Sequence, residues 1–444
     1  GAPCVPLVQV GDTVKRGQKI GDAEGLCVPV HASVSGTVVA IERRPHPTAG
    51  TALAVVIEND FKDETVTNPL PGTEDEILHA IREAGIVGMG GAAFPGNVKA
   101  LSAMGNVDTL IANACECEPY ITADDSLLRT NPAHVLEEYP RPQLRRENYT
   151  ILNGIYQYAF TGSSEMPSCY DGEILVPFSP ETEMSGVGRQ LQPNEYLWYE
   201  RSFILEQLPK GKRLLLHFGA CDERCRVYIN GEQVGTHAGG YQAFYFDITA
   251  FIKEGENKLQ VCVKDVSDTS YHGRGKQKLK NGGMFYTAQS GIWQTVWYEW
   301  VPEIYVQSMH IIPHFDEDSV EIELFTNEEG KFLPYKVYIF DRGHLISEMS
   351  IEDGHRMMLP IPNKKAWSPV SPFLYDVTIM YGEDFIQSYF GMRHFSVEKD
   401  SNGILRLCLN HVPYFQNGIL DQGYWPESLL TPPTDEALEY DIRV

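Results

Sequence analysis

From Tyr149 to about Val397 the chain is a succession of short aromatic and β-branched runs separated by Gly, Asn and Asp turns. Such runs predict β-strands, and within VYINGEQVG the pair Asn230-Gly231 gives the strongest short-range signal for a β-hairpin. Helical periodicity is nearly absent until TPPTDEALEYDI near the C-terminus. A stretch of about 250 residues with this pattern predicts two β-sandwiches, and we expect the break between them near Val301–Pro302.

The first third of the chain follows a different pattern. Residues 1–60 contain short Val-rich runs broken by Gly, which predict a small β unit. TEDEILHAIREAG at 73–85 changes to helical periodicity, with a capping box at Thr73–Glu76 and a closing Gly85. The two unlike halves meet near Glu138–Arg146.

Composition limits the classes of function. The chain has 444 residues with 36 Lys and Arg against 60 Asp and Glu, a net charge of −24. Neutralising phosphates requires basic patches, so this balance argues against a nucleic-acid partner. No run approaches the ~20 apolar residues that a spanning helix needs, so no transmembrane span is predicted.

Nine cysteines are scattered along the chain without paired CxxC knuckles. This spacing predicts neither a disulfide framework nor a zinc site, and we expect no metal ligands. Free thiols favour a reducing, cytoplasmic setting. Because the first residue is Gly1 and no leader follows it, we interpret the chain as a fragment, a processed product or a trimmed chain.

Two N-terminal segments have residue types suited to binding a nucleotide. GIVGMGGAAFPGNVK at 85–99 contains Gly88, Gly90 and Gly91, whose backbone N–H groups can form an anion-binding nest. Lys99 follows, within reach of a phosphate. After an apolar run, NACECEPYITADD supplies polar groups for ribityl or ribose hydroxyls, namely Asn113, Glu116 and Glu118.

HASVSGTVVAIE, GIVGMGGAAFPGNVK and NACECEPYITADD together resemble RnfC, the C subunit of the Rnf ion-translocating electron-transport complex, over about residues 1–138. The resemblance implies a barrel-sandwich hybrid at 1–62 and part of an α/β segment binding FMN or NAD at 63–138. It also implies partnership with Rnf subunits at the periphery of the inner membrane. Met89 and Cys115 depart from the family pattern. PVHASVSGTV lacks a lysine for a covalent prosthetic group, and the cysteine spacing predicts no iron–sulfur cluster, so we expect no redox activity.

From Tyr139 onward the motifs VYINGEQVGTHAGGYQAFYFDIT, VKDVSDTSYHGRGKQ and YTAQSGIWQTVWYEW strongly resemble family 2 glycoside hydrolases. That resemblance implies a sugar-binding jelly roll at 139–301, an immunoglobulin-like sandwich at 302–397 and the start of a (β/α)₈ barrel at 398–444. The fold class expected for the whole chain is therefore mainly β and multidomain. By resemblance, the sugar-binding residues are Asp268, Arg274, Trp293, Asp421 and Trp425. No cofactor is required for this part, and its partner is a β-linked sugar or oligosaccharide.

A retaining glycosidase needs two carboxylates about 5–5.5 Å apart, and the family's glutamates come from later barrel strands. We therefore expect no hydrolysis of a nitrophenyl β-glycoside by these 444 residues. Two other readings stay open: a fragment of an electron-transport protein that binds FMN or NAD, and a product with no ligand. The join near Glu138–Tyr139 is equally consistent with an assembly error, a recombination event or deliberate construction.

Overall fold

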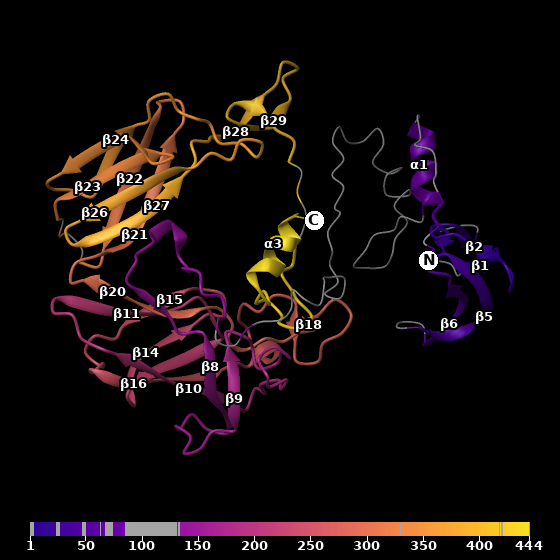
Figure 1. Ribbon diagram of the computed structural model, residues 1–444, viewed down its shortest axis with the longest axis horizontal. Helices are drawn as coiled ribbons and strands as arrows, with labels where there is room; N and C mark the ends of the chain where they lie inside the picture. Colours follow the sequence, from indigo (N-terminus) through magenta and orange to yellow (C-terminus); the bar gives the residue numbers. More distant parts are fainter. Residues whose placement is uncertain are drawn as a thin grey trace. The chain divides into compact units, whose positions relative to one another are not determined.

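The computed structural model describes residues 4–23, 27–46, 50–62, 64–66, 74–84, 131, 134–328, 331, 333–416, 418 and 421–443. The chain divides into two compact units. The first comprises residues 1–118 and 417–422, and the second comprises residues 119–416 and 423–444. Strands dominate the described residues, in agreement with the mainly β, multidomain prediction (Figure 1).

The first unit contains two small antiparallel sheets. One has the order β1 (Val5–Pro6), β3 (Lys19–Asp22), β4 (Val30–His31), and the other has the order β2 (Thr13–Val14), β5 (Gly36–His46), β6 (Gly50–Asn59). Their alternating residues bury one compact core, formed by Val8, Val14, Ile20, Ala32 and Val38. At Gly36 the backbone has a φ of +153°, and a Cβ there would lie 1.9 Å from the Glu58 carbonyl oxygen, so only glycine fits.

The helix expected at 73–85 forms as α1 (Glu74–Glu83). Its last turn is tied to β3 by two ion pairs. Arg82 Nη2 lies 3.0 Å from Asp22 Oδ1, and Lys19 Nζ lies 2.5 Å from Glu83 Oε2. These contacts hold the C-terminal end of the helix against the small β unit.

The second unit begins with a two-sheet sandwich. Its larger sheet has the order β14 (Glu232–Ala238), β13 (Arg224–Ile229), β16 (Gly255–Lys264), β10 (Tyr196–Leu205), β8 (Gly154–Thr161), β9 (Gly172–Val176). The facing sheet has the order β15 (Phe244–Asp247), β11 (Lys212–Phe218), β20 (Val296–Pro302), β7 (Tyr149–Ile151). Between them lies the largest apolar core among the described residues, which includes Leu197, Leu214, Val227, Val261 and Val296.

The predicted hairpin is confirmed. Asn230 and Gly231 have φ values of +53° and +85° and connect β13 to β14. Positive φ at both central positions is what a type I′ turn requires. The Asn230 side-chain amide also donates to the Phe251 carbonyl at 2.9 Å, which fixes the turn to the following loop.

A second sandwich follows in the same unit. It packs a sheet of order β21 (Val306–His314), β22 (Ser319–Thr326), β25 (Arg356–Pro360) against a sheet of order β24 (His344–Ile351), β23 (Tyr335–Asp341), β26 (Tyr375–Tyr381), β27 (Asp384–Phe390). Strict alternation decides which side chains are buried. In YDVTIMY of β26, for example, Tyr375, Val377, Ile379 and Tyr381 point into the core.

One buried charge cluster connects the two sandwiches. The Arg146 guanidinium donates to Asp384 at 2.7 and 2.8 Å, to Glu299 at 3.0 Å and to the Val306 carbonyl at 2.7 Å. Burial would raise the pKa of Glu299, but the His217 hydrogen bond and the Arg146 and Arg141 charges lower it to about 2. Glu299 is therefore ionised at neutral pH, and Arg146 binds carboxylates from β20 and β27 together.

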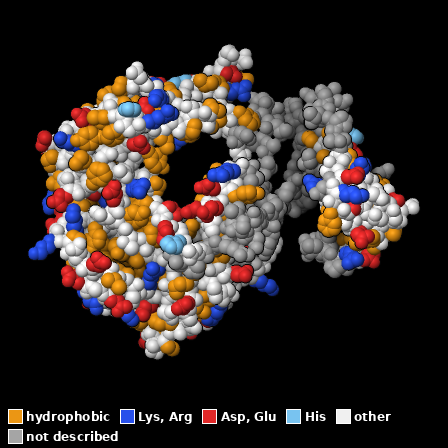
Figure 2. Space-filling model, viewed as in Figure 1, with side chains coloured by type: hydrophobic (Ala, Val, Ile, Leu, Met, Phe, Trp, Pro, Cys, Tyr) orange, Lys and Arg blue, Asp and Glu red, His pale blue; other side chains and the backbone are white. Residues whose placement is uncertain are grey.

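A small sheet and a helix follow the second sandwich along the chain. The sheet has the order β28 (Phe395–Lys399), β29 (Leu405–Leu409), β30 (Val412–Pro413), and the helix is α3 (Asp435–Arg443). Apolar residues of this sheet are exposed, among them Phe395, Val397, Leu405 and Leu407. Hydrophobic side chains reach the surface between charged ones on both sandwiches as well (Figure 2). Among the described residues, no helix is both long and apolar enough to cross a membrane.

Candidate functional site

A long polar loop at 265–290 joins β16 to the final strands of the first sandwich. It contains the 3-10 helix η3 (Ser267–Thr269) and the short parallel pair β17 (Gln277–Lys278) and β18 (Tyr286–Thr287). The buried Gln277 side chain links the middle of the loop to its end and to Tyr241. Its Nε2 donates to the Tyr241 hydroxyl and its Oε1 accepts from the Gln289 N–H, both at 2.7 Å. We call residues 265–290 the polar loop.

Beside the base of the polar loop is a group of buried acids with one histidine. His272 Nδ1 lies 3.5 Å from Glu223 Oε2, and His272 Nε2 lies 3.7 Å from Asp265 Oδ1. Burial, aided by the charges of Asp265 and Glu223, raises the pKa of Asp222 to about 8. Burial likewise raises the pKa of Asp265 to about 6. Asp222 is therefore largely protonated at neutral pH, and the group gathers several carboxyl groups where little solvent reaches them.

Three residues predicted from sequence lie in or beside the polar loop. Asp268 is half-buried on η3, where its Oδ1 accepts the Leu279 N–H at 3.2 Å. The Arg274 Nη1 donates to the Ser270 carbonyl at 3.2 Å. Trp293 is only 7 % exposed, and its indole N–H donates to the Gly240 carbonyl at 2.7 Å. The structure thus brings these three residues to one region of the sandwich, and sugar contact by any of them stays a prediction.

The segment after Gly423 packs on the same sandwich. The Tyr424 ring stacks on Tyr286 with centroids 3.9 Å apart, and the Thr431 hydroxyl donates to the Trp293 carbonyl at 2.6 Å. Trp425, predicted as a sugar-binding residue, is buried, and its backbone pairs with Leu429. The other predicted residue here, Asp421, is exposed and belongs to the first unit.

Sequence reasoning missed Tyr241 and Gln277, the pair that closes the polar loop. No local signal marks them, because the two residues are 36 positions apart and each looks like an ordinary loop residue. A glycine-rich stretch around Tyr241 is the one available hint. Gly240 could not carry a Cβ, which would lie 2.2 Å from Asp222 Oδ1.

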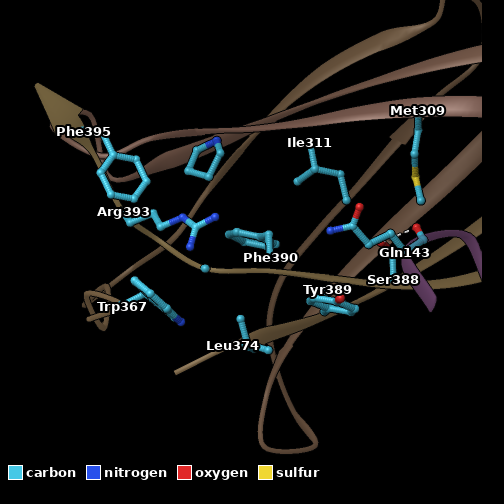
Figure 3. A pocket seen from close by; sticks show the side chains of 12 residues that line it. Gln143, Met309, Ile311, Trp367, Leu374, Ser388, Tyr389, Phe390, Arg393 and Phe395 are labelled. Carbon is cyan, nitrogen blue, oxygen red and sulfur yellow. Dashed lines mark hydrogen bonds between the residues drawn. The ribbon is translucent and has the colours of Figure 1, made fainter. Parts of the chain in front are cut away.

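A second concave surface, on the second sandwich, was also missed. It is a groove of about 560 Å³ whose aromatic lining includes Trp367, Phe390 and Phe395 (Figure 3). The Arg393 guanidinium lies 4.7 Å from the Trp367 ring centroid and 5.3 Å from that of Phe395. Two other lining residues are joined by a hydrogen bond, which Ser388 donates to the Gln143 carbonyl at 2.7 Å (Figure 3). The sequence pattern assigns such aromatic residues to cores.

Comparison with known families divides the chain into distinct segments. Residues 1–62 match the RnfC barrel sandwich hybrid domain, and residues 81–139 match the Nuo51 FMN-binding domain. Residues 186–302 match the sugar binding domain of family 2 glycosyl hydrolases. Different segments of this chain therefore resemble two protein families. We call residues 1–138 the Rnf-like part and residues 139–444 the hydrolase-like part.

Curated relatives match the Rnf-like part. The C subunit of the Na⁺-translocating ferredoxin:NAD⁺ oxidoreductase complex of Acetobacterium woodii is 46 % identical over 144 residues, covering 31 % of this chain and 32 % of the relative. The C subunit of the proton-translocating ferredoxin:NAD⁺ oxidoreductase complex of Clostridium ljungdahlii is 49 % identical over 133 residues, covering 28 % and 29 %. The chain therefore spans about a third or less of these relatives.

Solved structures match the hydrolase-like part. A β-glucuronidase from an uncultured Clostridium sp. superposes with a TM-score of 0.54 at 24 % identity, covering 67 % of this chain and 53 % of that chain. The β-glucuronidase of Ruminococcus gnavus gives 0.53 at 21 %, covering 65 % and 52 %. At these identities the likeness shows a shared fold, and the chain spans about half of each enzyme.

The nucleotide-binding residues predicted for the Rnf-like part lie outside the described residues. They are Gly88, Gly90, Gly91, Lys99, Asn113, Glu116 and Glu118. The match of residues 81–139 to an FMN-binding domain covers all of them. Their roles stay predictions.

Proposed function

We propose that the hydrolase-like part binds a β-linked sugar or oligosaccharide through the polar loop of its first sandwich. The observation that carries this proposal is the match of residues 186–302 to a sugar binding domain. The polar loop supports it with the residue types that sugars need. Arg274 and Asp268 offer charged hydrogen-bonding groups, and Tyr241 is 43 % exposed beside them in the fold.

Tyr241 is held in a defined position, which favours stacking on an apolar sugar face. Its hydroxyl accepts from Gln277 Nε2, and its ring meets Trp293 edge to face with centroids 5.8 Å apart. A preorganised ring loses little conformational entropy on binding. We expect affinity in the millimolar range, about −4 kcal/mol.

Titration of the 444-residue chain with methyl β-D-glucuronide and methyl β-D-galactoside, followed by NMR and tryptophan fluorescence, tests this proposal. We expect Arg274→Gln to weaken binding at least fivefold. The matched control is Arg342→Gln on the second sandwich, which should leave binding unchanged. Saturation curves that are identical for the wild type and Arg274→Gln would refute a site at the polar loop.

For the Rnf-like part we propose a second function, binding of FMN or NAD and docking to Rnf subunits on the cytoplasmic side of the inner membrane. The match of residues 81–139 to an FMN-binding domain favours it, as does the identity with the relatives from Rnf-type complexes. Purified chain mixed with FMN should show quenched flavin fluorescence and a higher melting temperature. Unchanged fluorescence together with an unchanged melting temperature would rule out the flavin.

A further inference from the structure

The histidine and two of the acids at the base of the polar loop come from three positions in the sequence. Glu223 lies in the turn before β13, Asp265 directly follows β16, and His272 lies in the polar loop after η3. Each offers one ligand atom, and the three atoms lie within 4.8 Å of one another. One imidazole nitrogen and two carboxylate oxygens are donors that zinc accepts.

The three ligand atoms are spaced more widely than hydrogen-bonded atoms, with one imidazole nitrogen and two carboxylate oxygens within 4.8 Å of one another. His272 Nδ1 lies 3.5 Å from Glu223 Oε2, and the other ring nitrogen, Nε2, lies 3.7 Å from Asp265 Oδ1. Both distances are longer than N–H···O bonds, which are about 2.7–3.2 Å. Ligand atoms bound at 2.0–2.2 Å with tetrahedral or octahedral angles stand about 3.0–3.6 Å apart. Binding one ion therefore requires His272 to use a single ring nitrogen and the side chains to move inward until the three ligand atoms reach this spacing.

His272 itself supplies the second observation. Its side chain is 10 % exposed, its Nδ1 has no hydrogen-bond partner, and that atom faces Glu223 Oε2. A buried polar atom without a partner costs free energy. Coordination of a cation by the imidazole and the two carboxylates would remove that cost, and two buried carboxylates match the charge of one divalent ion.

Neighbouring hydrogen bonds hold both carboxylates in place. Asp265 Oδ1 accepts the Ser267 N–H at 2.7 Å, and Glu223 Oε1 accepts the Arg224 Nε–H at 3.1 Å. The second bond leaves Glu223 Oε2 directed at His272. Metal ligands are typically oriented by outer contacts of this kind.

We propose that Glu223, Asp265 and His272 bind one Zn²⁺ ion that fastens the polar loop to the ends of β13 and β16. The nitrogen ligand disfavours Ca²⁺ and Mg²⁺, which take oxygen ligands. Three protein ligands leave a coordination position for water or another oxygen donor. This inference is independent of the sugar proposal, because the ion would stabilise the loop whether or not a sugar binds there.

Equilibrium dialysis of the EDTA-treated 444-residue chain against Zn²⁺, with metal measured by mass spectrometry, tests the site. His272→Gln should lose one bound equivalent, and Glu223→Gln should weaken Zn²⁺ binding at least tenfold. His344→Gln, which alters an exposed histidine on β24, is the matched control and should bind as the wild type does. Circular dichroism checks that each variant folds.

Hydrogen exchange provides a second readout. Zn²⁺ should slow exchange of amides in the polar loop of the wild type and leave the loop of His272→Gln unaffected. The same zinc content in the wild type and His272→Gln overturns the proposal, and so does preferential binding of Ca²⁺. Destabilisation of His272→Gln without any effect of Zn²⁺ would mean that the imidazole merely bridges two carboxylates, which also overturns it.

Discussion

Arg146 offers the sharpest test of what holds the hydrolase-like part together. Its side chain is 4 % exposed and makes four hydrogen bonds, three of them to carboxylate oxygens. Substitution Arg146→Met removes all four. Glu299 then keeps contacts with Arg141 at 2.6 Å and the Tyr139 hydroxyl at 3.1 Å. Asp384 keeps a hydrogen bond from the Val306 N–H at 2.9 Å but has no other cation partner among the described residues.

The loss therefore falls mainly on Asp384, which is 2 % exposed. Breaking a buried ion pair from one side costs about 3–5 kcal/mol, because a charge is left buried and unpaired. Native-state hydrogen exchange of amides in β20 and β27 measures this cost locally, without assuming two-state unfolding of a multidomain chain. We expect the free energy of opening in both strands to fall by about 4 kcal/mol.

Two further variants decide whether the reasoning is right. Lys212→Met removes an exposed ion pair with Glu383 between the same two sandwiches, and it should cost at most about 1 kcal/mol. The double variant Arg146→Met/Asp384→Asn should lose about 2 kcal/mol less stability than the sum of the losses in the two single variants, because it leaves no unpaired charge at position 384. A cost of Arg146→Met similar to that of Lys212→Met, or strict additivity, would refute the explanation.

Two other predictions concern single positions. Burial raises the pKa of the Glu181 carboxyl group to about 8. Between about pH 4.5 and pH 8 the folded chain therefore keeps a proton that the unfolded chain has lost. The contribution of this group to the free energy of unfolding declines as pH rises through that range. We expect the free energy of unfolding to decline by about 2 kcal/mol, because the Glu181 side chain is still partly exposed to solvent. Calorimetry should show that the stability of Glu181→Gln depends less on pH than that of the wild type. Parallel pH profiles of the two proteins would contradict this. In the first unit, Gly36→Ala should lower the free energy of unfolding by about 3 kcal/mol, because the added Cβ would lie 1.9 Å from a backbone oxygen. Gly11→Ala is the control: Gly11 has a φ of +98° and a Cβ there would meet no atom within 4 Å, so this variant should lose about 1 kcal/mol of stability. If Gly11→Ala and Gly36→Ala changed hydrogen exchange in β5 equally, the clash at Gly36 would have been relieved.

Local patterns in the sequence predicted much of the fold. Asn230-Gly231 specifies a turn within a few residues, and the structure has it. The capping residues at 73–76 and the periodicity after them predicted α1, which begins at Glu74. In each case the interaction that decides the structure is short-range, so the sequence displays it directly.

Features that depend on distant partners were not visible in the same way. RPQLRRENY reads as a polar, extended link, yet Arg146 within it is buried because Glu299 and Asp384 come to it from far along the chain. Trp293 looks like a loop residue in the sequence, and the fold buries it under the backbone at Gly240. Glu223, Asp265 and His272 form no sequence motif, and only the folded sheets bring their side chains together.

The Arg146 cluster also determines when this chain can finish folding as it is synthesised. Glu299 and Asp384 lie 153 and 238 residues after Arg146. At 5–20 residues per second, a ribosome needs roughly 10–50 seconds after Arg146 to deliver Asp384. Until then Arg146 can pair with Glu299 of the first sandwich, but it lacks its two hydrogen bonds to Asp384. A translation pause within the second sandwich would therefore prolong the period in which a chaperone, or another nascent chain, can bind there.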